Sequence, residues 1–128
     1  MRIAVDTTRY CDFCAGVPEA VERLATAQEI HLPFVTLAEL RAGFLCGTKA
    51  RRNEAALIGF LNGPRVRVLL PDGDTTHHYA RLFAQLRAQG TPIPTNDIWI
   101  AALVLQHDLL LYSRDEHYAR LPQVPRLG

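Results

Sequence analysis

Four acidic residues stand where the chain can bring their side chains together: Asp6, Glu39, Asp97 and Asp115. Closely packed carboxylates repel one another and raise one another's pKa, so they stay ionised together most easily around a divalent cation. Carboxylate oxygens suit hard ions such as Mg²⁺ and Mn²⁺, which activate a water and stabilise charge on a phosphoryl oxygen. The four acids therefore predict a Mg²⁺ or Mn²⁺ site that is suited to phosphodiester hydrolysis.

The elements that must position these acids alternate between strands and helices. Short apolar runs predict strands over residues 2–5, 30–35, 66–70 and 109–112. Helical periodicity and end signals predict helices over residues 9–14, 18–28, 36–46, 49–61, 75–89, 96–106 and 115–121, before a Pro-rich tail. This alternation indicates an α/β protein with a mostly parallel sheet and helices on both faces, organised as a single domain over residues 1–128.

The order of elements predicts that the acids meet at one edge of the sheet. Functional groups of parallel sheets collect outside the carboxyl ends of the strands. Asp6 follows the first predicted strand, Glu39 lies just after the second, and Asp115 follows the last. Asp97 begins a helix that is apolar almost all round, which indicates a helix in the centre of the protein.

Three of the acids also have ordinary explanations. Thr36 and Glu39 have the spacing of a capping box at the start of a helix. Asp97 and Asp115 also stand where acidic residues cap helices. Asp6 is harder to explain by stability, because a charged group directly after a buried strand seldom stabilises a fold. The case for a shared site therefore rests on the placement of all four.

Composition limits the class of protein. Of the 128 residues, 48% are hydrophobic and 21% are charged, as in ordinary globular proteins. The net charge of +1 does not favour bulk attraction to nucleic acid, so such a partner has to be bound locally. No run approaches the ~18 apolar residues of a membrane span. An odd number of cysteines and the absence of a signal peptide predict a cytoplasmic protein without membrane contact.

Two other signals favour different chemistry. Cys11 and Cys14 form a C-x-x-C motif near a helix start, which is typical of redox dithiols, but no Trp precedes Cys11, and we expect both to face the core. A zinc site would need about four ligands, and the chain offers no second close pair. A receiver-like signalling domain would need a late lysine, whereas the only lysine is Lys49. His117 stands two residues after Asp115, within reach of the rim of the acidic pocket, but a solvated helix position is expected.

The sequence resembles the PIN-domain nucleases, and most of all the VapC-type toxins of bacterial toxin–antitoxin pairs. The matching segments keep the family's order and lie at residues 3–8, 36–40, 92–102 and 111–118. The third segment, which reads PIPTNDIWIAA, is the most specific.

The resemblance implies a PIN-like three-layer α/β/α fold with about five strands and a Mg²⁺- or Mn²⁺-dependent endoribonuclease. It implies that Asp6 and Asp97 bind the metal directly, and that Glu39 and Asp115 do so directly or through water. Residues that would orient the acids are Asn96 and Ser113.

The resemblance also implies partners: an RNA substrate (tRNA, rRNA or mRNA), an antitoxin protein and a second copy in a homodimer. Weaker candidates for contacts to RNA phosphates are the basic residues Arg41, Lys49, Arg51, Arg52 and Arg114. The alternative function is a non-catalytic PIN-fold module that binds RNA or protein and uses its acids as helix caps. Metal binding distinguishes the two, because only the enzyme requires Asp6 and Asp97 to share an ion.

Overall fold

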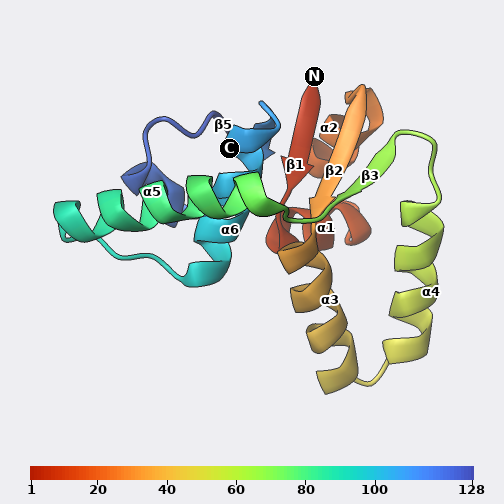
Figure 1. Ribbon diagram of the computed structural model, residues 1–128. Helices are drawn as coiled ribbons and strands as arrows, with labels where there is room; N and C mark the ends of the chain where they lie inside the picture. The colour runs from red at the N-terminus through yellow and green to blue at the C-terminus, as the bar shows by residue number, and fades with distance from the viewer.

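Five parallel strands form the central sheet of this computed structural model, which describes residues 1–128 (Figure 1). The strands are β1 (Arg2–Val5), β2 (Glu29–Pro33), β3 (Val66–Leu69), β4 (Leu110–Tyr112) and β5 (Arg126–Leu127). Their order is β3-β2-β1-β4-β5, so β1 lies at the centre between β2 and β4. The predicted α/β class and parallel sheet are confirmed.

Helices cover both faces of this sheet. They are α1 (Thr7–Cys14), α2 (Pro18–Thr26), α3 (Phe34–Cys46), α4 (Ala50–Leu61), α5 (Gly73–Gln89), α6 (Thr95–Gln106) and a 3₁₀ turn η1 (Glu116–Arg120). Side chains alternate along β1: Ile3 and Val5 pack with α1 to α4, whereas Ala4 packs with α5 and α6. Two apolar cores therefore enclose the sheet, which gives the three layers that the sequence predicted.

Helix α6 is the central helix of the second core. Its residues from Ile100 to Val104 are all at most 2% exposed, as its continuous apolar sequence indicated. The core around α6 fixes the position of the helix, and the polar first turn of α6 projects beyond that core. No helix of the protein combines the length and the apolar character that a membrane span requires.

Several element boundaries differ from the sequence prediction by one or two residues, and one strand was not predicted. The second strand ends at Pro33 and α3 begins at Phe34, two residues before the predicted start. Proline fixes φ near the value for a helix start and lacks an N–H, so the chain leaves the sheet there. The Pro-rich tail, where the pattern predicted no strand, forms β5 through pairing of Arg126 with Leu111. Two residues are too few to give a recognisable alternation.

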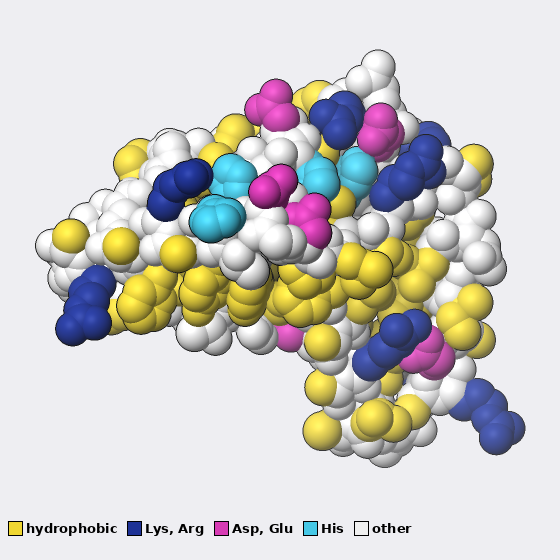
Figure 2. All heavy atoms as spheres, in the orientation of Figure 1, with side chains coloured by type: hydrophobic (Ala, Val, Ile, Leu, Met, Phe, Trp, Pro, Cys, Tyr) yellow, Lys and Arg dark blue, Asp and Glu magenta, His cyan; other side chains and the backbone are white.

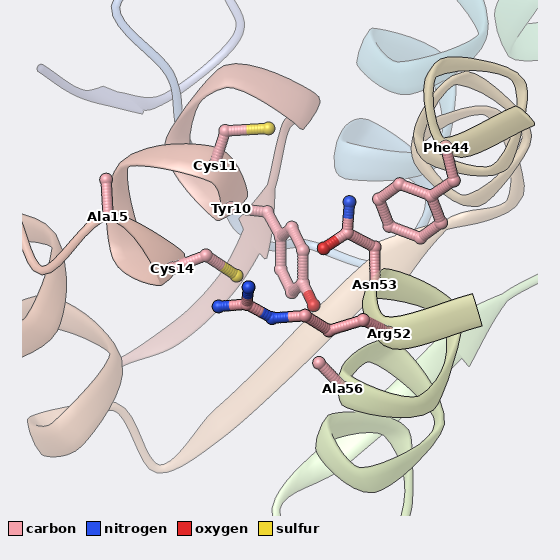
Figure 3. Close-up of a pocket in the computed structure, with 8 residues that line it drawn as sticks. All are labelled: Tyr10, Cys11, Cys14, Ala15, Phe44, Arg52, Asn53 and Ala56. Carbon is pink, nitrogen blue, oxygen red and sulfur yellow. The ribbon is translucent and has the colours of Figure 1, made fainter. Parts of the chain in front are cut away.

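An open cleft of about 470 Å³ lies between α1 and α4 (Figure 3). It is lined by Tyr10, Cys11, Cys14, Ala15, Phe44, Arg52, Asn53 and Ala56. The prediction that Cys11 and Cys14 face the core is wrong, because both are exposed thiols in the wall of this cleft. Helix α1 buries Arg9 and Tyr10 instead, which directs the cysteines outward.

Candidate active site

Asp6 and Ser113 meet because β1 and β4 are parallel neighbours. Val5 pairs with Tyr112, so the next residue of each strand emerges at the same edge of the sheet. The Ser113 hydroxyl donates a hydrogen bond to Oδ2 of Asp6. Oδ1 of Asp6 accepts from the backbone N–H of Arg9 at 2.9 Å, so Asp6 also caps α1. Asp6 is only 6% exposed, and all of its hydrogen-bond partners hold the carboxylate in one orientation.

Helix α3 brings Glu39 to the same edge. The Thr36 hydroxyl donates to the carbonyl of Val5 at 3.2 Å, which fixes the first turn of α3 against the end of β1. Glu39 then accepts from the Thr7 hydroxyl at 2.6 Å and from the Asn96 amide at 3.3 Å. The capping box predicted for Thr36 and Glu39 is wrong, because α3 begins at Phe34 without a side-chain cap. Glu39 is therefore available to the site.

Asp97 and Asp115 approach each other from α6 and the turn after β4. Nδ1 of His117 lies 2.8 Å from Oδ2 of Asp97 and 3.2 Å from Oδ1 of Asp115. The backbone N–H of His117 donates to Oδ1 of Asp115 at 2.9 Å, so Asp115 also caps η1. One ligand atom from each of Asp97, Asp115 and His117 lies within 4.8 Å of the others. These three ligand atoms are close enough together to bind one metal ion.

A chain of hydrogen bonds links this trio to Asp6. The backbone N–H of Asp115 donates to the Ser113 hydroxyl at 3.1 Å, and that hydroxyl donates to Asp6. The phenol of Tyr118 lies under the site, 3.5 Å from Asp97. Burial, followed by the charges of all four acids, raises the pKa of Tyr118 far above its usual range. The structure therefore brings the four predicted acids to one site, together with Asn96 and Ser113.

Two of the acids carry charges that the protein only partly compensates. Burial raises the pKa of Asp6, and the charge of Asp115 adds to this, although the hydrogen bonds from Ser113 and Arg9 oppose it. Burial also raises the pKa of Asp97, and the charges of Asp115 and Glu39 act in the same direction against the contact with His117. A carboxylate cluster with raised pKa values is a common feature of functional sites and is relieved by a bound cation.

Three polar residues of the site were not among the predicted site residues: Thr7, His117 and Tyr118. The expectation that His117 is simply a solvated helix residue is wrong, because its ring contacts two of the acids and is 39% exposed. Residue periodicity gave no signal for this contact, because it does not distinguish an α-helix from the 3₁₀ turn that brings His117 back toward Asp115. Thr7 directly follows Asp6, at the start of α1.

The basic residues predicted to contact RNA lie in different surroundings. Arg41 forms a two-pronged ion pair with Glu54, with distances of 3.1 and 3.0 Å. Arg114 forms a similar pair with Asp12 at 3.1 and 3.2 Å. The remaining three, on or next to the first turn of α4, form no ion pair: Lys49, Arg51 and Arg52. Of the five residues, Arg114 is beside the acidic site in sequence and also borders the same polar pocket as Ser113.

Comparisons with known proteins identify relatives of this chain. The sequence pattern of the PIN domain matches residues 12–124. Ribonuclease VapC4 of Mycobacterium tuberculosis is 33% identical over 90 residues, which cover 70% of this chain and 69% of that protein. Ribonuclease VapC1 of Haemophilus influenzae is 31% identical over 99 residues, which cover 77% of this chain and 72% of that protein.

A solved structure of VapBC-1 from nontypeable Haemophilus influenzae has the same fold. It superimposes with a TM-score of 0.88 at 25% identity and covers 100% of this chain and 98% of that one. The sheet, the acidic edge and these likenesses together show that the chain belongs to the PIN-domain family, among its VapC-type ribonucleases.

Proposed function

We propose that this protein cleaves RNA at the acidic edge with the help of one or more Mg²⁺ or Mn²⁺ ions held by Asp6, Glu39, Asp97 and Asp115, as the toxin of a toxin–antitoxin pair. The observation that carries the proposal is the convergence of these four acids, from four distant segments, around Ser113, His117 and Tyr118. A divalent cation bound here stabilises negative charge on a phosphoryl oxygen and lowers the pKa of a bound water.

The residues present fit such an ion. Their donor atoms are carboxylate oxygens and one imidazole nitrogen, and those of Asp97, Asp115 and His117 lie within 4.8 Å of one another. Each oxygen of a carboxylate has two lone pairs, so Asp6 can bind an ion while it keeps its bonds to Ser113 and Arg9. The raised pKa values of Asp6 and Asp97 mark negative charge that the protein itself leaves partly uncompensated.

The residues around the acids hold their orientation. Ser113 fixes one oxygen of Asp6, and Thr7 and Asn96 hold the two oxygens of Glu39. Orienting bonds of this kind typically change metal affinity or activity 10–100-fold when they are removed. The chain's own part in the reaction is therefore to hold the acids in place, to orient the phosphodiester and to keep its neighbouring phosphates bound.

A polar pocket of about 280 Å³ beside the acids is suited to a neighbouring RNA phosphate. It is lined by Ser113, Arg114, Glu116, Arg126 and Gly128. Ser113 is shared with the acidic site, and Arg126 also donates to the carbonyl of Asp115 at 3.2 Å. The guanidinium of Arg126 in this pocket favours a phosphate contact, because the planar group pairs well with phosphate oxygens. The guanidinium of Arg114 is already paired with Asp12.

Replacing Arg126 with glutamine is expected to weaken RNA binding at low salt and to reduce the salt dependence of binding. Loss of one phosphate contact to single-stranded RNA lowers the slope of log K against log salt by about 0.7. Fluorescence anisotropy with a labelled single-stranded RNA, in an inactive Asp97→Asn background, measures both quantities. The matched control Arg81→Gln removes an exposed charge from α5. Equal slopes of log K against log salt in the two variants would show that RNA does not bind in the pocket lined by Arg126.

Two apolar surfaces are candidates for protein partners. The similar solved structure is of a VapBC pair, so we propose that an antitoxin segment lies in the cleft between α1 and α4, where Phe44 is partly exposed and Cys11 and Cys14 are exposed (Figure 3). Figure 2 shows a second apolar band below α5 that continues toward α3. Partly exposed aromatic rings pack in series between the two helices through Phe34, Trp99, Tyr79 and Phe83. We propose this band as the surface for a second copy.

The proposed function is tested by metal removal. Incubated with total RNA, the purified protein is expected to produce discrete fragments with Mg²⁺ or Mn²⁺ and none with excess EDTA. Readdition of the ion after chelation should restore cleavage. Gel analysis of end-labelled RNA measures the effect. Cleavage that persists in EDTA would refute the metal-dependent mechanism. A protein that binds RNA but never cleaves it would favour the non-catalytic module.

A further inference from the structure

We propose that His117 is itself a ligand of the bound cation, so that the site offers an imidazole nitrogen as well as carboxylate oxygens. This inference rests on the proposed metal-dependent function and adds a ligand to it. His117 belongs to the one group of three or more potential ligand residues in the protein whose donor atoms lie within 4.8 Å of one another. The four acids alone do not form such a group, because Asp6 and Glu39 lie outside it.

The distances around His117 match those between neighbouring ligands of one small ion. An octahedral ion with ligands at about 2.1 Å places adjacent ligand atoms about 3 Å apart. Nδ1 of His117 lies 2.8 Å from Oδ2 of Asp97 and 3.2 Å from Oδ1 of Asp115. The ring nitrogen therefore already occupies a position that a ligand adjacent to both carboxylates would have.

The backbone holds His117 in this position. Its N–H donates to Oδ1 of Asp115 at 2.9 Å, and the next residue, Tyr118, is 1% exposed and anchors η1 in the core. The imidazole is thus fixed at its base, between a buried neighbour and two acids. A metal ligand gains affinity when its side chain is already held in position before the ion binds. The contacts of His117 with the two acids therefore favour a role as a ligand over that of a solvated side chain.

A nitrogen ligand changes which ion the site prefers. Carboxylate and water suit Mg²⁺ and Mn²⁺ alike, whereas imidazole is a softer donor that transition metals accept more readily than Mg²⁺. His117 should therefore shift the preference of the site toward Mn²⁺. This is distinct from a role in which His117 only orients Asp97 through a hydrogen bond, because an orienting residue contributes no nitrogen to the ion.

Pulsed electron paramagnetic resonance on the Mn²⁺-loaded protein separates these roles. The wild type is expected to show ¹⁴N modulation from a coordinated imidazole, and His117→Ala is expected to lose it. His117→Gln, which keeps a polar side chain near Asp97, should also lose it, and covers the case in which the alanine variant does not fold. The matched control His77→Ala, at an exposed position of α5, should keep the signal.

Metal titrations provide the second readout. The dissociation constant for Mn²⁺ should rise about 10–100-fold in His117→Gln, and the constant for Mg²⁺ should rise less, so that the Mn²⁺ preference falls. Wild-type protein that binds Mn²⁺ without ¹⁴N modulation would overturn the assignment of His117 and leave the proposed function intact. Wild-type protein that binds neither ion would contradict both.

Discussion

Replacing Asp97 with asparagine is expected to lower the rate of RNA cleavage by about 10²–10³-fold or more, as for other groups that stabilise charge in a transition state. Asparagine keeps the shape of the side chain, but it has no charge and only one oxygen. In the wild type, both oxygens of Asp97 are engaged, with His117 on one and Tyr118 on the other. The substitution therefore removes a proposed metal ligand without opening a cavity.

The control for this experiment is Asp108→Asn. Asp108 is exposed just beyond the end of α6, a helix of 12 residues whose first turn holds Asp97. A helix of that length is about 18 Å long, so the control removes the same charge far from the site. Asp108 has φ of 55°, a conformation that asparagine adopts readily, so the control should fold normally. Equal cleavage by Asp97→Asn and Asp108→Asn would exclude Asp97 from the catalytic site.

The same substitution is expected to stabilise the metal-free protein at neutral pH. The pKa of Asp97 is raised in the folded protein, mainly by burial, so the folded state binds protons more tightly than the unfolded state. The stability that this group contributes is fully present below its unfolded pKa and is lost as pH rises through the folded value. Above that pH, the buried charge destabilises the fold, and Asp97→Asn removes this destabilisation.

Urea unfolding in EDTA from pH 4 to pH 8 measures this effect. The free energy of unfolding of Asp97→Asn, minus that of the wild type, should grow as pH rises and then level off. Mn²⁺ at about one hundred times its dissociation constant should stabilise the wild type by about 2.7 kcal/mol at pH 8 and the variant much less. A difference that is constant with pH would show that the charge of Asp97 is not the cause. Such a trade of stability for function is common at active sites.

The convergence of the acids could be predicted because it follows from topology. Asp6 and Ser113 directly follow strands, and parallel strands end at the same edge whichever helices surround them. The position of Glu39 at this edge was also predictable. Its expected role in a capping box was wrong. That role depended on the start of α3, and the start of a helix is the least certain feature of a sequence pattern.

The contacts of His117 and the exposure of the cysteines could not be predicted in the same way. His117 reaches Asp97 because the segment after Asp115 is a 3₁₀ turn rather than an α-helix, a difference that residue periodicity does not resolve over five residues. Cys11 and Cys14 are exposed because α1 places Arg9 in the interior, with its guanidinium 4.6 Å from the ring of Tyr112. Arginine is usually exposed and cysteine is usually buried, so a helix that buries Arg9 and exposes both cysteines is the reverse of the usual pattern.

The bond between Ser113 and Asp6 joins residues that are 107 positions apart, and it has a consequence for synthesis of the protein. A ribosome makes the chain from its N-terminus at about 5–20 residues per second, so Asp6 emerges many seconds before β4 exists to pair with β1. During that time Asp6 lacks Ser113, and Asp97 lacks the turn that carries Asp115 and His117. The growing chain therefore cannot assemble the acidic site until residues up to His117 have been made.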